Sequence, residues 1–144
     1  MHSRMKNPAM VLDAFPAIQE LMKTVFGSGV DPVTMNLVAL RVGQMNECRL
    51  CIHDAMGKGG DRLGRVVDWH IQDCFTPAER AALKLTEEAT ALGAEYNSVS
   101  DETWAHVEEH FDERQRAGLV LMIGAMNMFT RMNITTRQHT AEWT

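Results

Sequence analysis

Basic blocks, signal-peptide features and long hydrophobic runs are all missing from this sequence, and each absence excludes a class of function. No segment concentrates Lys and Arg, and 14 basic against 19 acidic residues leave a formal net charge of −5, which argues against nucleic acid as a partner. The charged start, residues 1–8, is not followed by an uninterrupted apolar segment, so we expect no signal peptide and a cytoplasmic location. The most apolar run, residues 118–129, spans about a dozen residues where a bilayer requires about 20, so we expect no membrane span.

Cysteine and aromatic residues are also scarce. The chain has three cysteines, Cys48, Cys51 and Cys74. In a reducing cytosol these are expected to be catalytic, metal-binding or inert, because a structural disulfide would tend to be reduced there. Aromatic residues make up 6% of the chain, against 11 methionines, which predicts an adaptable, sulfur-rich core.

No strand pattern is found, and the apolar residues instead recur at helical spacing between start and stop signals. The predicted fold is all-α: a single-domain helical bundle of about six to seven helices over residues 1–144. The strongest signal is Thr76-Pro77-Ala78-Glu79, a capping box with proline at the first helical position. The expected starts lie at Asp13 and Pro16, Asp31 and Pro32, Asn46, Asp61, Thr76, Ser100 and Asp112, and the expected stops at Gly27 and Gly29, at Gly57, Gly59 and Gly60, and at Gly93, followed by a loop over residues 96–99.

The last long helix is expected to start at Asp112 and to be buried on nearly every side over residues 118–129. This stretch is almost entirely apolar and is broken only by Asn127. Gly118 and Gly124 are expected to let another helix approach closely, in the core or at a subunit interface. After Met132 the chain turns polar, and we expect residues 133–144 to form a tail that docks Trp143.

The chemistry of the chain is expected at Cys48 and Cys51, which are three residues apart. On a helix, positions i and i+3 share a face with Cβ atoms roughly 5 to 6 Å apart, which is close enough for a disulfide to form with little backbone movement. Asn46 is the expected N-cap, which would place both Glu47 and Cys48 in the first turn. The positive end of the helix dipole favours a thiolate there, so the pair is predicted to cycle between dithiol and disulfide.

The same spacing also serves other kinds of site. Haem attachment requires a histidine directly after the second cysteine, and Ile52 stands there. A structural zinc site requires four ligands, and only Cys74 and His70 could be recruited to complete it. A third alternative is two small buried residues without chemistry. The redox pair is the reading we favour, with no metal and no cofactor.

Thiol catalysis also requires groups that accept and donate protons near the sulfur. Helical spacing places Glu47, Asp54, Ala55 and Lys58 on the side of Cys51. His53 lies about 200° round the helix from Cys51 and is expected to point elsewhere. Glu47 is a candidate general base, although its negative charge opposes a thiolate. Cys74 is expected to be a packed thiol, with a resolving cysteine as the alternative.

Four segments together resemble a known family more specifically than the cysteine pair does. They are MKNPAM at residues 5–10, LRVGQMN at 40–46 leading into CRLC at 48–51, FTPAERAAL at 75–83, and NITTRQ at 133–138. These residues resemble the alkylhydroperoxidase D-like (AhpD-like) or carboxymuconolactone decarboxylase-like proteins, in the branch that carries CxxC. The resemblance implies an all-helical fold and a homo-oligomer such as a trimer or hexamer. It also implies a thiol peroxidase or disulfide reductase whose cysteines are reduced by a partner protein.

The sequence departs from this family at the proton relay. The peroxidase branch usually has a histidine four residues after the second cysteine and a glutamate twelve before the first, where this chain has Ala55 and Asn36. General acid–base assistance is worth on the order of 10²- to 10⁴-fold, so its loss predicts a weakened enzyme. Exposure at the start of the motif would favour Cys48 as the attacking sulfur, whereas the usual relay position would serve Cys51.

The resulting prediction is a thiol-dependent peroxidase or disulfide oxidoreductase that reduces a hydroperoxide or small oxidant, with Cys48 and Cys51 as its catalytic residues. Glu47 or Asp54 is a candidate substitute for the relay. The alternative is a non-catalytic helical oligomer in which the cysteine pair senses redox state or only packs.

Overall fold

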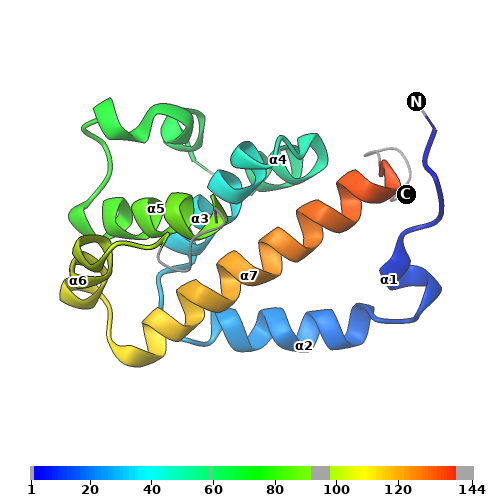
Figure 1. The fold of residues 1–144 in the computed structure, drawn as a ribbon, viewed down its shortest axis with the longest axis horizontal. Coiled ribbons are helices and arrows are strands. Elements are labelled where there is room, and N and C mark those ends of the chain that lie inside the picture. The colour runs from blue at the N-terminus through cyan, green and yellow to red at the C-terminus, as the bar shows by residue number, and fades with distance from the viewer. Residues whose placement is uncertain (1, 59, 92–97, 139–144) are drawn as a thin grey trace.

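The computed structural model describes residues 2–58, 60–91 and 98–138, which form helices joined by short connections (Figure 1). Within these ranges there is no strand, which confirms the all-α prediction. The helical elements are α1 (Pro8–Val11), α2 (Phe15–Phe26), α3 (Pro32–Met45), α4 (Arg49–Met56), the 3₁₀ helix η1 (Leu63–Ile71), α5 (Pro77–Thr90), α6 (Asp101–His110) and α7 (Glu113–Thr136).

Helix α3 lies at the centre of the fold and contacts α4, η1, α5 and α7. It begins as the sequence predicts, because the Asp31 side chain accepts a hydrogen bond of 2.8 Å from the backbone N–H of Val33 and Pro32 occupies the first helical position. One core cluster packs α3 against α2, α5, α6 and α7. A second packs its other side against α4, η1 and α5, around Leu37, Leu40 and Trp69. The helix is therefore buried along most of its length.

Most of the other predicted boundaries are confirmed. Thr76 and Glu79 form the capping box of α5, Ser100 caps α6, and Asp112 caps α7 through a second capping box. Gly27 ends α2 as expected, but the predicted start at Asp13 is wrong, because Ala14 is the N-cap and no side chain caps the helix. The predicted stop at Gly93, the first half of the predicted loop over residues 96–99, and Trp143 all lie outside the described residues.

Helix α7 corrects two predictions. It is not buried on nearly every side, because its neighbours cover one side and leave Val120, Leu121 and Met128 between 45% and 48% exposed. It also continues four residues past Met132, to Thr136, where the sequence predicted a polar tail. Among the described helices it alone is long and apolar enough to cross a membrane, a test that the core helix of a soluble protein also passes. Its packing against α2, α3 and α5 is that of a core helix.

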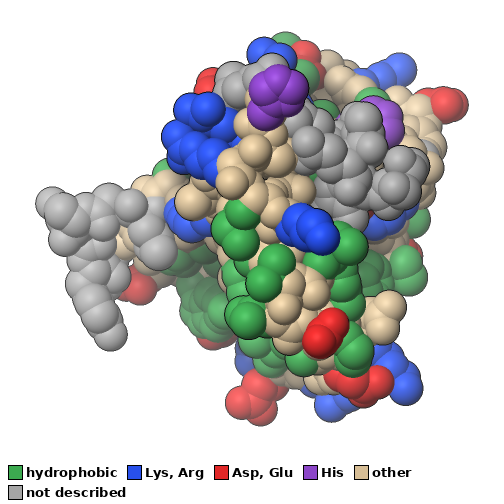
Figure 2. Space-filling model, turned by 90° about the vertical axis from the view of Figure 1, so that its right-hand side faces the viewer, with side chains coloured by type: hydrophobic (Ala, Val, Ile, Leu, Met, Phe, Trp, Pro, Cys, Tyr) green, Lys and Arg blue, Asp and Glu red, His purple; other side chains and the backbone are tan. Residues whose placement is uncertain are grey.

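The surface also exposes apolar side chains at the N-terminal end of the molecule. Figure 2 shows hydrophobic side chains gathered in the lower half of the face that carries α1, with few charges among them. In and beside α1, Met10, Val11 and Leu12 are 52%, 54% and 77% exposed.

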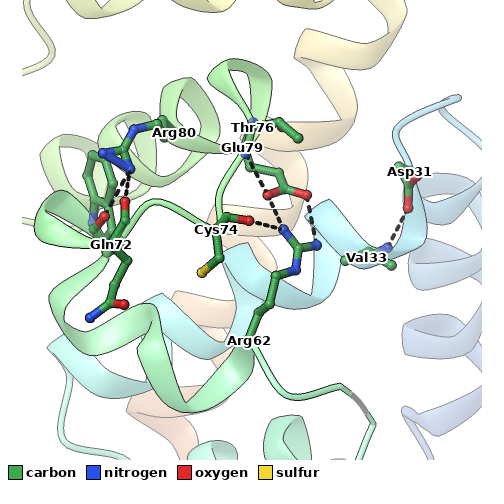
Figure 3. Close-up of polar contacts among 9 residues, drawn as sticks. Asp31, Val33, Arg62, Gln72, Cys74, Thr76, Glu79 and Arg80 are labelled. Atoms are coloured by element: carbon green, nitrogen blue, oxygen red, sulfur yellow. Dashed lines mark hydrogen bonds and ion pairs between the residues drawn. The ribbon is translucent and has the colours of Figure 1, made fainter.

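The segment after α4 differs from the predicted helix capped by Asp61. It is a 3₁₀ helix, Arg62 occupies the position before it without a side-chain cap, and the backbone is kinked at Asp68. Contacts from α5 hold this segment in place (Figure 3). Arg62 donates two hydrogen bonds of 2.6 and 2.9 Å to the carboxylate of Glu79, and Arg80 donates to the backbone carbonyls of Trp69 and Gln72. The hydrogen bonds to Glu79 raise the pKa of Arg62, so this pair stays charged.

Candidate active site

The chain reverses direction between α3 and α4, immediately before the cysteines. Asn46 is the C-cap of α3, not the N-cap of the next helix, because its backbone N–H still donates to the carbonyl of Val42. Glu47 then adopts a left-handed conformation with φ of 53°, and Cys48 becomes the N-cap of α4. The Sγ of Cys48 accepts a hydrogen bond of 3.3 Å from the backbone N–H of Cys51. The prediction that Asn46 caps the motif helix is therefore wrong.

The side chain of Asn46 ties this turn to α7. Its amide nitrogen donates to Asn127 Oδ1 at 2.9 Å and to Thr130 Oγ1 at 2.8 Å. Asn127 in turn donates to Thr90 Oγ1 at the end of α5 and to the carbonyl of Ile123. The polar break in the apolar stretch of α7 is thus the anchor of the turn that carries Cys48.

The two sulfurs lie together as predicted. The Cα atoms of Cys48 and Cys51 are 5.3 Å apart, within the range of disulfides, and their Sγ atoms are at bonding distance. Gly43 of α3 allows this close approach, because a Cβ there would lie 3.3 Å from the Cβ of Cys51. The pair is therefore pressed against the central helix.

Burial reverses the expectation that Cys48 is the more exposed sulfur. Cys48 is 2% exposed and Cys51 is 6% exposed. A cavity of about 440 Å³ is lined by Cys51 but not by Cys48. The reason is that Cys48 lies in the turn packed between α3 and α4, whereas Cys51 is one helical turn further on.

Four helices form this cavity: α2, α3, α4 and α7. Its lining is largely apolar and includes three methionines. The core as a whole is not rich in sulfur as predicted, because only Met35 and Met122 of the described methionines are buried. The apolar lining consists of Met22, Phe26, Ala39, Leu50, Ala55, Met122, Met126 and Phe129.

Both positions at which the family resemblance expects a proton relay line the cavity. Asn36 on α3 and Ala55 on α4 line the cavity together with Cys51, so the fold brings these positions to the sulfur. Neither the amide of Asn36 nor the methyl group of Ala55 accepts or donates a proton at physiological pH. Positions 36 and 55 therefore lie beside Cys51 but carry no proton-transfer group.

Not all of the other acid–base candidates lie where helical spacing predicted. Asp54 and Lys58 line the cavity as expected, and they form an exposed ion pair of 2.8 Å. His53 also lines it, because the cavity spreads over about half of the circumference of α4, and its position about 200° round the helix from Cys51 is the one expected. Glu47 is exposed in the turn before the helix and is not a lining residue.

Asn133 is a site residue that the spacing argument missed. It lies on α7, 82 positions after Cys51, and its Nδ2 donates to the Sγ of Cys51 at 3.5 Å. The side chain lines the cavity. The only signal in the sequence was its place in the segment NITTRQ.

Cys74 lies apart from this site. It is half-buried, packs against the second core cluster and is not a cavity residue. Its carbonyl accepts a hydrogen bond of 2.9 Å from Arg62 (Figure 3). This placement agrees with a packed thiol. Over the described parts of the chain, no three His, Cys, Asp or Glu side chains are grouped so as to hold a metal ion.

Comparisons with known proteins point in one direction. The carboxymuconolactone decarboxylase family matches residues 13–88, a span that contains the three cysteines and the relay positions. The uncharacterized protein YdfG of Bacillus subtilis (strain 168) is 32% identical over 140 residues, which cover 93% of this chain and 94% of YdfG. The uncharacterized protein YnjA of Escherichia coli (strain K12) is 31% identical over 112 residues, 74% of this chain and 60% of YnjA.

A solved structure shows the same fold. The crystal structure of ATU0492 from Agrobacterium tumefaciens matches with a TM-score of 0.83 and 23% identity, covering 96% of this chain and 97% of that one. ATU0492 is described as a protein of unknown function and a candidate antioxidant defence protein AhpD. The likeness establishes an AhpD-like helical architecture.

Proposed function

This chain belongs to the carboxymuconolactone decarboxylase family, and from that premise we propose that it is a thiol-dependent oxidoreductase. In this proposal Cys48 and Cys51 reduce a hydroperoxide or another small oxidant and are left as a disulfide. The observation that carries it is the position of Cys51, which is at disulfide distance from Cys48 and opens onto a cavity large enough for a small molecule.

Cys51 is the attacking sulfur in this mechanism, because it alone of the pair lines the cavity. Its thiolate attacks the terminal oxygen of a hydroperoxide, the O–O bond breaks, and the alcohol leaves with a proton from solvent. Cys51 becomes a sulfenic acid. The Cys48 thiol then attacks that sulfur, water leaves and the disulfide forms, and a dithiol or a reducing partner protein restores both thiols.

The rate is expected to be low for this family. Asn36 and Ala55 supply no proton acceptor, and general acid–base assistance is worth about 10²- to 10⁴-fold. His53, Asp54 and Lys58 are the titratable groups that line the cavity, and they are the candidates for partial compensation.

Serine substitutions test this order of events. In the presence of dithiothreitol, Cys51→Ser abolishes hydroperoxide consumption. Cys48→Ser forms a sulfenic acid that dimedone traps at Cys51, as mass spectrometry would show. Cys74→Ser is the matched control and behaves as wild type. Full turnover by Cys51→Ser would contradict the assignment, and labelling at Cys48 in that variant would reverse the roles.

A second candidate is a redox sensor without turnover, and the lack of a proton-transfer group at Asn36 and Ala55 favours it. Such a protein loses two thiols once per chain on exposure to peroxide and consumes no further peroxide when a dithiol is supplied. Continued consumption separates the enzyme from the sensor.

We also propose that the protein is a cytoplasmic homo-oligomer, a trimer or hexamer. Supporting this, α7 exposes Val120, Leu121 and Met128, with open space around Gly124 between them. A second apolar area surrounds α1 (Figure 2). Patches of this kind are typical of protein interfaces. Light scattering after gel filtration measures the mass, and Leu121→Glu lowers it if α7 forms the interface. A monomeric wild-type mass would refute the proposal.

A further inference from the structure

Asn133 lines the cavity, and only one of the two polar atoms of its side-chain amide has a hydrogen-bond partner among the described residues. The residue is 8% exposed, and its Nδ2 donates to Cys51 Sγ at 3.5 Å. Its Oδ1 is buried and has no hydrogen-bond partner among the described residues. Buried polar atoms are nearly always paired, so an unpaired acceptor on a residue that lines the cavity indicates that a donor binds there.

A second asparagine on the same helix shows the difference. Both side-chain atoms of Asn127 are paired: its Oδ1 accepts from Asn46 and Arg131, and its Nδ2 donates to Thr90 and Ile123. The other buried unpaired side-chain atoms of the described residues belong to Asn7 and Ser98, which do not line the cavity. The free acceptor of Asn133 is therefore specific to the place where Cys51 reacts.

We propose that Asn133 binds the oxidant and supports the nucleophile with the two ends of one amide. Its Oδ1 accepts a hydrogen bond from the terminal O–H of a hydroperoxide, and its Nδ2 donates to the Cys51 thiolate. This inference rests on the proposed function. It narrows the preferred substrate to oxidants that carry a hydroxyl on the oxygen that is attacked.

The chemistry follows from the planarity of the amide. Because Oδ1 and Nδ2 belong to one rigid group, the bound hydroxyl oxygen is held beside the sulfur that attacks it. The thiolate forms an S–O bond to that oxygen, the O–O bond breaks, and the departing alkoxide takes a proton from solvent. The hydroxyl then belongs to the sulfenic acid, and Oδ1 can keep its hydrogen bond until Cys48 displaces water.

Two oxidants distinguish the role of Asn133 Oδ1 from the role of Nδ2. Cumene hydroperoxide carries a terminal hydroxyl, whereas the disulfide reagent 5,5′-dithiobis(2-nitrobenzoate) carries no hydroxyl. Both react with the Cys51 thiolate, so a change in thiolate fraction affects both rates. A lost contact to Oδ1 affects the hydroperoxide alone. The ratio of the two rates therefore reports on Oδ1, and the pH midpoint of iodoacetamide alkylation reports on Nδ2.

Asn133→Leu, which is nearly isosteric, is the first variant, and Gln72→Leu, which removes an amide outside the cavity, is the matched control. In the reduced full-length protein, Asn133→Leu is expected to lower the hydroperoxide-to-disulfide rate ratio roughly ten- to hundred-fold and to raise the alkylation midpoint by about one pH unit. Gln72→Leu is expected to leave the ratio and the midpoint as in wild type. An unchanged ratio in a folded Asn133→Leu protein overturns the role of Oδ1.

If Asn133→Leu fails to fold, Asn133→Asp tests the roles of Oδ1 and Nδ2 instead. It keeps an oxygen acceptor and loses the donor, so the rate ratio stays near wild type while the alkylation midpoint rises. A midpoint unchanged from wild type overturns the role of Nδ2, and a ratio that falls as far as expected for leucine overturns the role of Oδ1. If wild type itself loses no thiol to the hydroperoxide but reacts with the disulfide reagent, the proposed peroxidase function fails instead.

Discussion

Two glycines of α7 provide a sharp test of the packing, because the same substitution should have opposite effects at each. A Cβ at Gly118 would overlap the hydroxyl and Cβ of Ser28 and lie 3.2 Å from Met35 Cε. Ser28 cannot rotate away freely, since its hydroxyl donates to the carbonyl of Val25 at 2.6 Å. A Cβ at Gly124 has no heavy atom within 4 Å among the described residues.

The magnitudes follow from two terms. Alanine in place of glycine gains about 1 kcal/mol of helix propensity at either position. At Gly118 the overlap costs about 3 kcal/mol, the upper end of the usual range, because the obstructing atoms are tied to the backbone. Gly118→Ala should therefore destabilise the protein by about 2 kcal/mol and Gly124→Ala should stabilise it by about 1 kcal/mol. In melting temperature this corresponds to about 8 °C lower and about 4 °C higher.

Urea unfolding followed by circular dichroism measures both free energies, at a protein concentration where wild type and variants have the same mass. A rescue experiment tests the named contact: Ser28→Gly added to Gly118→Ala should recover part of the loss, although Ser28→Gly alone is destabilising. Equal effects of alanine at the two glycines, or no rescue by Ser28→Gly, would refute this account of how α7 packs on the turn between α2 and α3.

Three further outcomes are expected. Asn36→Glu combined with Ala55→His should raise the hydroperoxide rate by about 10²- to 10⁴-fold, and either change alone by less; an unchanged rate would show that the relay positions do not serve Cys51. Burial raises the pKa of Glu88, but hydrogen bonds from Thr103 and Ser100 outweigh it and lower the pKa below the ordinary value of 4.5. The stability that this contact contributes is present above pH 4.5 and is lost as the pH falls below it. In Glu88→Gln the free energy of unfolding, measured in urea, should therefore fall less steeply below pH 4.5 than in wild type; an equally steep fall would contradict this. Arg62→Ala removes the ion-pair partner of Glu79, whose carboxylate keeps only the capping hydrogen bond from Thr76, and should cost about 2 kcal/mol, less than a fully buried pair because Arg62 is 35% exposed; a loss below half of that in urea unfolding would show that the pair is screened.

The absence of the relay and the retention of the cavity have to be explained together. Ala55 and Asn36 remove the proton acceptors, yet Gly43 still allows α4 to press Cys51 against α3 at the cavity wall. A protein whose cysteines only packed would not require an open cavity beside one of them. This arrangement supports the proposed thiol site, and the variants at positions 36, 55 and 133 test it.

The sequence by itself determined where most helices begin and that two thiols can meet. Asp31, Thr76, Ser100 and Asp112 all cap helices as predicted, because a cap hydrogen bond joins residues only two or three positions apart. The spacing of Cys48 and Cys51 is local in the same sense. Composition did not predict where the methionines lie: among the described residues Met35 and Met122 are buried in the core, whereas Met5, Met10, Met56 and Met128 are exposed.

Only the tertiary structure decided the role of residues whose partners are distant in the chain. Asparagine suits both the start and the end of a helix, and Asn46 ends α3 while its side chain bonds to Asn127 and Thr130, more than 80 positions away. An apolar helix does not reveal which side its neighbours leave open, so the exposed face of α7 could not be predicted. The cavity lies between four helices that are remote from one another in the sequence. Cys51 and Asn133 meet at its wall only because these helices pack together.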